Sequence, residues 1–152
     1  EWNEVIDFIE NQFVEKVLQK KAVQTWVEWQ VVYQIEVFGL ESSQIWCLDF
    51  AGEDAVIIKG RVGKINLYEG IACSELYRLI HQDTSWDYVG INGQYRTFKD
   101  IYRIQLGEFE KWEGEVNEKF PQPLTELFPA GADMDRSKFM RDVRRWKSKF
   151  NP

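Results

Sequence analysis

Few side chains in this 152-residue sequence combine the chemistry and the spacing that catalysis requires. The one histidine, His81, stands near Asp83 and Asp87, but a metal site or a general-base dyad would need a second histidine or a cysteine close by. Cys47 and Cys73 are not at metal-ligand spacing, and Cys73 is about two helical turns from the histidine. The residue types therefore predict no catalytic site and no metal site.

A cluster of glutamates and one short glycine pair are the other candidates for ligand chemistry. The cluster lacks the ladder of aspartates that precedes the glycine of a calcium loop, so a solvated surface is the expectation. The pair Gly60 and Gly63 is too short for a phosphate-binding loop and indicates a turn. We therefore expect no cofactor and no enzyme activity. The glutamates concerned are Glu108, Glu110, Glu113, Glu115 and Glu118.

Composition and charge limit the classes of function. With 44% hydrophobic and 15% aromatic residues, the chain is expected to bury one substantial core. Residues 136–152 hold seven Lys or Arg and one acid, so the rest of the chain carries a net charge of −12, which argues against nucleic acid as a partner. Apolar runs are too short for a transmembrane helix.

Cysteine content and the N-terminus bear on location. Two cysteines form no disulfide framework, which favours a reducing compartment, and no signal peptide is visible, so a cytoplasmic location is expected. The chain begins at Glu1 and not at Met, as an excised domain or a processed form does.

Hydrophobic periodicity predicts the elements of the first half. Apolar residues at spacings of three and four predict an amphipathic helix over residues 2–20. Period-two alternation from Val23 to Val37 predicts a long strand. Alternation and turn residues predict three more antiparallel strands, over residues 44–50, 55–61 and 64–71.

The second half is expected to cover the sheet. Ser74 is placed to cap a helix over residues 75–81. Gly90 and Gly93 indicate a bend in a short strand over residues 86–95.

Helical periodicity returns from Arg96 to Trp112. Three prolines predict an extended connector over residues 119–133, and a basic helix over residues 137–149 follows. This order predicts an α+β fold: a curled, mainly antiparallel sheet of about five strands with helices on one face, plus N- and C-terminal helices. The expected domain is residues 1–118, with the connector and basic helix of 119–152 packing on it.

Four segments between residues 22 and 112 carry a family pattern. They are the strand pair VEWQVVYQIEVF and SQIWCLDF, the serine-led helix in INLYEGIACSELYRLI, and SWDYVGINGQYRTFKDIY, with its glycine-flanked short strand and closing helix. Together they resemble the sterol carrier protein type 2-like family. Ser85-Trp86-Asp87, followed by Arg96 and Ile101-Tyr102, is most similar to versions appended to metallo-β-lactamase-fold or Rieske-type enzymes.

The resemblance implies a hydrophobic tunnel between sheet and helices that takes a lipid or an acyl chain. At such positions a plain core is the default over a ligand contact, and bulky side chains such as Tyr68 and Trp112 favour a filled interior. The expected function is a non-catalytic domain that binds a hydrophobic ligand, as an accessory domain of a larger protein. The residues expected to line the tunnel are Trp46, Leu48, Phe50, Val56, Ile58, Ile65, Leu67, Leu76, Ile80 and Ile91.

An interaction module is the alternative. Appended versions of this fold serve dimerisation or packing on a catalytic domain, which would need no ligand. The basic C-terminal helix has an apolar seam and could contact a protein partner, an RNA backbone or an anionic membrane, or fold back on the acidic body. The fold-back or a protein partner is favoured over a membrane. The residues expected at this contact are Arg141, Arg145, Trp146 and Lys149.

Overall fold

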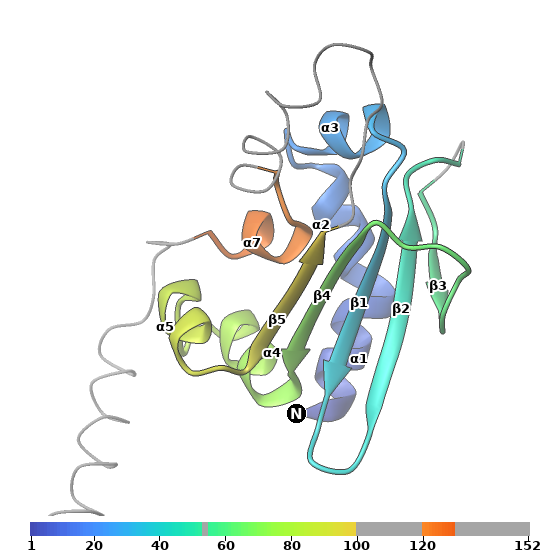
Figure 1. Cartoon of the computed structure of the whole chain (residues 1–152). Coiled ribbons are helices and arrows are strands. Elements are labelled where there is room, and N and C mark those ends of the chain that lie inside the picture. Colours follow the sequence, from blue (N-terminus) through green and yellow to red (C-terminus); the bar gives the residue numbers. More distant parts are fainter. Residues whose placement is uncertain (53–54, 100–119, 130–152) are drawn as a thin grey trace, which may run out of the picture.

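A five-stranded sheet with helices packed on one face is the architecture of the part of the chain that the computed structural model describes, residues 1–52, 55–99 and 120–129 (Figure 1). This confirms the predicted α+β class, its strand number and its one-sided helical layer. In chain order the elements are α1 (Trp2–Phe8), the π-helix η1 (Ile9–Phe13), α2 (Val14–Leu18), α3 (Val23–Glu28), β1 (Val32–Phe38), β2 (Ser43–Asp49), β3 (Ile57–Lys59), β4 (Leu67–Ala72), α4 (Cys73–Ile80), α5 (Trp86–Ile91), β5 (Tyr95–Lys99) and α7 (Pro123–Leu127).

The strands lie in the order β3-β2-β1-β4-β5, and one pair is parallel. β4 runs parallel to β1, whereas the other neighbours are antiparallel, so the prediction of four antiparallel strands was wrong for β4. The reason is that β3 and β4 point the same way, so the link over residues 60–66 must return along the sheet. It crosses β2 and β1 on the face that the helices leave open, where the backbone of Val62 contacts the Cys47 thiol (Figure 1).

The N-terminal helix, α1 with η1 and α2, is continuous over residues 2–18. Helical backbone angles run through both junctions, which confirms the predicted helix. Its π-helical turn places four buried apolar side chains on the sheet side at a spacing of four, namely Val5, Ile9, Phe13 and Val17.

The strand predicted from Val23 was wrong in its first half, because α3 occupies residues 23–28. The period-two pattern there is overruled by Trp26, which is buried, while Val27 is exposed. The helix ends in a Schellman motif: Val31 N–H donates to the Trp26 carbonyl, and Gln30 N–H donates to the Val27 carbonyl. Gln30 has φ +52°, the left-handed conformation that this motif requires, and the strand begins only after it.

Three predictions for the second half were also wrong. Residues 86–91 form α5, and the strand β5 lies at 95–99, where a helix was expected to begin. The turn between them passes through Gly93 at φ +72°. Ser74 is not the cap of α4, because the helix begins at Cys73. Its N-cap residue is Ala72, which makes no side-chain cap hydrogen bond.

The proline-rich connector is partly helical. Pro123 occupies the first position of α7, where its missing N–H costs nothing. Phe120 and Leu124 are buried in the core, so this segment packs on the body. Residues 96–99 of the helix predicted over 96–112 belong to β5. The rest of that helix and the helix predicted over 137–149 lie outside the described residues.

Candidate functional site

The predicted tunnel residues do not surround a common space. Five of them are fully buried in the sheet–helix core: Trp46, Leu48, Phe50, Leu67 and Leu76. Three others lie on the outside of the described part of the chain, with exposed fractions of 57% for Val56, 47% for Ile58 and 82% for Ile91. Ile65 and Ile80 are half-buried.

Aromatic side chains fill the interface between the sheet and the N-terminal helix. Phe13 stacks on Tyr33 with ring centroids 6.1 Å apart. The Trp46 indole N–H donates to Glu10 Oε1 at 3.1 Å, and that carboxylate also pairs with Lys59. The large Trp46 side chain is therefore used for packing at this interface.

A pocket of about 450 Å³ lies elsewhere, between helices. Its walls come from the N-terminal helix, from the end of α4 with the start of α5, and from the end of α7. We call it the interhelical pocket. Ile80 is the one predicted tunnel residue that lines it. The lining residues are Phe8, Gln12, Lys16, Gln19, Lys20, Leu79, Ile80, Gln82, Thr84, Ser85, Trp86, Leu127, Phe128 and Pro129.

One side of the interhelical pocket is apolar. Phe8 and Leu79 are buried. The Phe8 ring lies 6.1 Å from the ring of Phe128, which stands at the end of α7. Trp86 packs edge-on against Tyr95 with centroids 4.8 Å apart, which fixes the indole at the pocket wall. These rings offer an apolar ligand a preformed contact surface.

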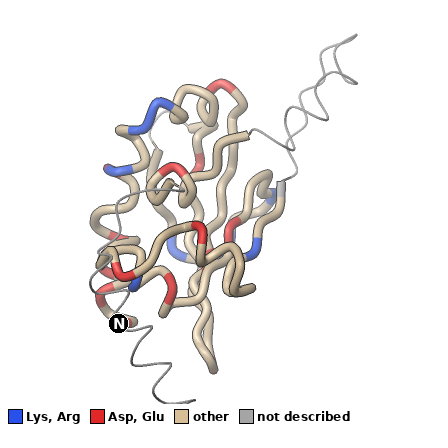
Figure 2. The backbone as a smooth tube through the Cα atoms, turned by 90° about the vertical axis from the view of Figure 1, so that its left-hand side faces the viewer, with Lys and Arg blue, Asp and Glu red and all other residues tan. Residues whose placement is uncertain are grey.

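The lining also includes polar side chains, two of them cations. Lys16 and Lys20 lie one turn apart on and just after α2, at the end of the N-terminal helix where Figure 2 shows basic residues gathered. Thr84 is buried at the pocket, and its Oγ1 has no hydrogen-bond partner in the described part of the chain. An unpaired buried hydroxyl is unfavourable.

The sequence reasoning missed the lysines and Thr84. The signal for the lysines was present, because Phe8, Gln12, Lys16 and Lys20 recur every four residues along one side of the predicted helix. The sequence contained no sign that α4, α5 and α7 converge on that stripe. Thr84 lies in a loop and had no periodicity to mark it.

The residues first considered for catalysis are held in structural roles. His81 Nε2 lies 3.0 Å from Glu4 Oε2, a contact that joins the end of α4 to α1. The His81 ring also packs on Tyr77, with ring centroids 4.3 Å apart. Burial raises the pKa of both the Cys47 and the Cys73 thiol, which disfavours the reactive thiolate.

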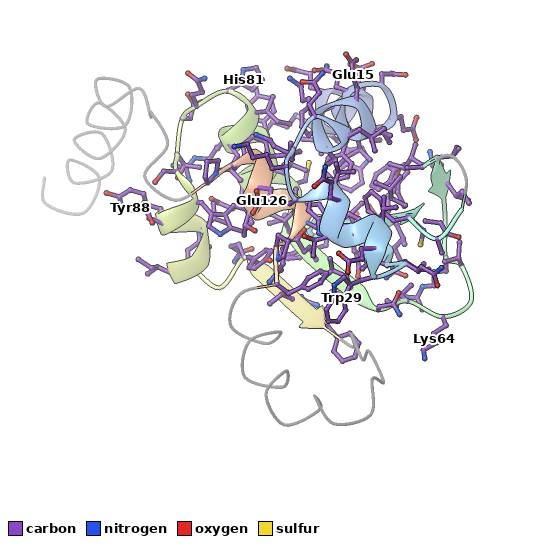
Figure 3. All side chains as sticks on the ribbon, turned by 90° about the horizontal axis from the view of Figure 1, so that it is seen from above. Glu15, Trp29, Lys64, His81, Tyr88 and Glu126 are labelled. Carbon is purple, nitrogen blue, oxygen red and sulfur yellow. The ribbon has the colours of Figure 1, made fainter. Side chains whose placement is uncertain are left out.

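Other surfaces add less. Among the described residues there is no group of three or more His, Cys, Asp or Glu side chains placed to share a metal ion. No described helix combines the length and the apolar character needed to span a bilayer. Tyr88, on α5, points away from the body (Figure 3). The glutamates at 108–118 and the basic contact residues at 141–149 lie outside the described residues.

Comparison with known proteins returned structures but no sequence family. No protein-family description matches the chain, and no curated protein matches it in sequence. Sterol carrier protein 2 of Yarrowia lipolytica aligns at a TM-score of 0.41 and 12% identity, over 64% of this chain and 81% of its own. Sterol carrier protein 2-like 3 of Aedes aegypti aligns at 0.41 and 14%, over 78% and 98%.

A third similar structure is the ubiquinone synthesis protein UbiJ-SCP2, at a TM-score of 0.39 and 17% identity, over 61% of this chain and 76% of its own. All three carry the name of the family that the sequence resembles. At such identities and TM-scores the likeness carries no argument, and the interhelical pocket has to support a function by itself. The resemblance to enzyme-appended versions stays a prediction.

Proposed function

We propose that this chain is a non-catalytic domain that binds a hydrophobic ligand with an acidic group, and that the ligand lies in the interhelical pocket. The observation that carries the proposal is the pocket itself, whose lining combines aromatic rings with Lys16 and Lys20. This retains the hydrophobic ligand expected from the sequence and moves its site from the sheet–helix interface to the space between helices.

The volume and the lining indicate how the affinity is divided. About 450 Å³ lies within the range of about 300–1,000 Å³ that is usual for small-molecule sites. Each CH₂ group that leaves water for the apolar wall contributes about 0.8 kcal/mol. A chain of several carbons therefore supplies most of the binding free energy, and the apolar wall determines affinity.

The lysines determine orientation and selectivity. Lys16 is exposed and Lys20 is partly buried, so a carboxylate beside them gains only about 0–1 kcal/mol from each pair. Together the two pairs contribute about 0–2 kcal/mol, which is a preference for an acid over the matching alcohol of up to roughly thirtyfold.

Calorimetric titration with dodecanoic acid and with dodecanol tests the proposal. We expect the acid to bind more tightly, and the double variant Lys16→Gln/Lys20→Gln to remove the preference while retaining binding of the alcohol. The matched control is Lys64→Gln, because Lys64 points outward on the side of the molecule away from the N-terminal helix (Figure 3). No binding of either compound, together with native mass spectra free of lipid, would refute the proposal.

We further propose that the domain acts in the cytoplasm as an accessory domain of a larger protein, with residues 119–152 packing on 1–118. Buried Phe120 and Leu124 support that packing. Both cysteines are buried and unpaired, as suits a reducing compartment. Binding in trans between this domain and a neighbouring domain of its gene product tests the accessory role, and its absence would argue against it.

A dimerisation or docking module is the second candidate, favoured by the open face of the sheet. Phe98 on β5 is 52% exposed, and strand register places it on the same face as Ile58 on the opposite edge strand. Light scattering of the wild type and of Phe98→Lys tests this reading. A wild-type dimer that Phe98→Lys converts to monomer would support it, and a monomeric wild type would count against a homodimer. Contact of Arg141, Arg145, Trp146 and Lys149 with a protein or membrane stays a prediction.

A further inference from the structure

A buried carboxylate holds one wall of the interhelical pocket from inside the sheet. Glu69 on β4 is completely buried and faces the helices. Its Oε2 accepts the Leu124 N–H of α7 at 2.9 Å, and its Oε1 accepts the Tyr95 hydroxyl of β5 at 2.7 Å. Tyr33 of β1 lies close as well: burial and then the Glu69 charge raise its pKa. Three elements thus meet at one side chain.

Neighbouring contacts extend this anchor along the segment before α7. The Trp26 indole N–H donates to the Pro121 carbonyl at 2.9 Å. Gln122 Oε1 lies 2.6 Å from the Tyr95 hydroxyl and accepts the Thr97 hydroxyl at 2.7 Å. The pocket residues Leu127, Phe128 and Pro129 begin three positions after Leu124, within one helical turn of the anchor.

We infer that Glu69 is a positioning residue of the interhelical pocket: it sets where the α7 wall stands without touching a ligand. The inference rests on the proposed function and adds a residue to it. A buried carboxylate is tolerated only when donors surround it, and here the donors come from the elements that must be aligned. Without an acceptor at this point, the Leu124 N–H would lie buried and unpaired, and α7 would shift toward water to satisfy it.

Two replacements of Glu69 separate hydrogen bonding from packing. In Glu69→Gln the amide oxygen accepts the Leu124 N–H, and the amide N–H₂ donates to the Tyr95 oxygen, whose own hydrogen turns to Gln122. The anchor therefore survives. In Glu69→Met the volume is similar but no acceptor remains, so α7 is released while the core stays filled.

The experiment measures amide hydrogen exchange and the affinity for dodecanoic acid in the full chain. We expect Glu69→Met to speed exchange in residues 124–128 selectively and to weaken binding at least about tenfold, and Glu69→Gln to stay within about threefold of wild type. Leu48→Ala is the matched control, because it destabilises the core away from the pocket and is expected to leave affinity unchanged.

The inference is overturned if Glu69→Met leaves exchange in residues 124–128 at the wild-type rate, or if Leu48→Ala weakens binding as much as Glu69→Met does. A wild type that binds no dodecanoic acid refutes the proposed function instead. In that case the exchange rates alone decide whether Glu69 positions α7.

Discussion

The sheet–helix interface and the interhelical pocket are built from similar residues and end in opposite states. At the interface, Phe13 comes from the N-terminal helix, and Tyr33 and Trp46 come from the neighbouring strands β1 and β2. Their rings are fully buried. At the pocket, Phe8, Trp86 and Phe128 come from three separate helical segments, and about 450 Å³ stays open between them.

The difference shows how the connections decide which apolar surface becomes core. A sheet presents a continuous face, so a helix laid along it can fill every position. The helical segments around the interhelical pocket meet at angles imposed by their loops, and their side chains do not fill the space between them. A tunnel predicted from apolar strand positions was therefore sought where packing is tightest.

Removal of a buried aromatic side chain from the core should have the largest effect. Trp26 is fully buried, and its ring lies 5.3 Å from that of Phe50. We expect Trp26→Ala to lower the free energy of unfolding by about 3–5 kcal/mol in urea titrations. Val27→Ala, at the exposed neighbour, should stay within about 0.5 kcal/mol. A loss below about 1 kcal/mol for Trp26→Ala would mean that the core between α3 and the sheet is not filled as described.

The same enlargement should be costly on one side and tolerated on the other. Leu48→Trp puts a larger ring into the filled interface and should lower the free energy of unfolding by about 1–3 kcal/mol or more. Leu127→Trp points into the interhelical pocket, where space exists, and should cost less than about 1 kcal/mol. It should also weaken binding of dodecanoic acid at least about tenfold, by calorimetry. Equal losses of stability would erase the contrast.

Alkaline pH should weaken the junction between the two regions. Burial, followed by the Glu69 charge, raises the pKa of Tyr33 and of Tyr95 above the ordinary tyrosine value. A raised pKa stabilises the fold below the unfolded value of about 10, and this contribution is lost as the pH rises above it. The free energy of unfolding should therefore fall above about pH 10, and less steeply in Tyr95→Phe. Tyr88→Phe, at an exposed ring, is the control; an unchanged slope in Tyr95→Phe would contradict the assignment.

The smallest effect is expected at the exposed edge of the filled interface. The Trp46 indole N–H and then Lys59 hold the pKa of Glu10 below its ordinary value. The contribution of Glu10 is therefore present above the ordinary glutamate pKa and is lost as the pH falls through the lowered one. Thermal melting of wild type and Glu10→Gln should differ slightly at neutral pH and converge in acid. A difference that grows in acid would reverse the assigned sign.

Periodicity predicted the elements whose partners are local or continuous. The N-terminal helix and β2 were placed almost to the residue, because the apolar residues of each recur at the period of its own element. Prediction failed at α3 and α5, where a single buried residue, Trp26 or Val89, decides the element and its partner lies far along the chain. For the site, Ile80 is the one residue expected in the tunnel that also lines the interhelical pocket, whereas Lys16, Lys20 and Thr84 were not named.

The sequence by itself determined the α+β class, the number of strands and the one-sided helical layer. These follow from period, composition and residue type, which are local properties. The tertiary structure decided the parallel pairing of β1 with β4, the placing of Glu69 under α7, and the position of the open volume. Each of these depends on how far apart the loops hold the ends of elements, and that distance is set by the packing of the whole chain.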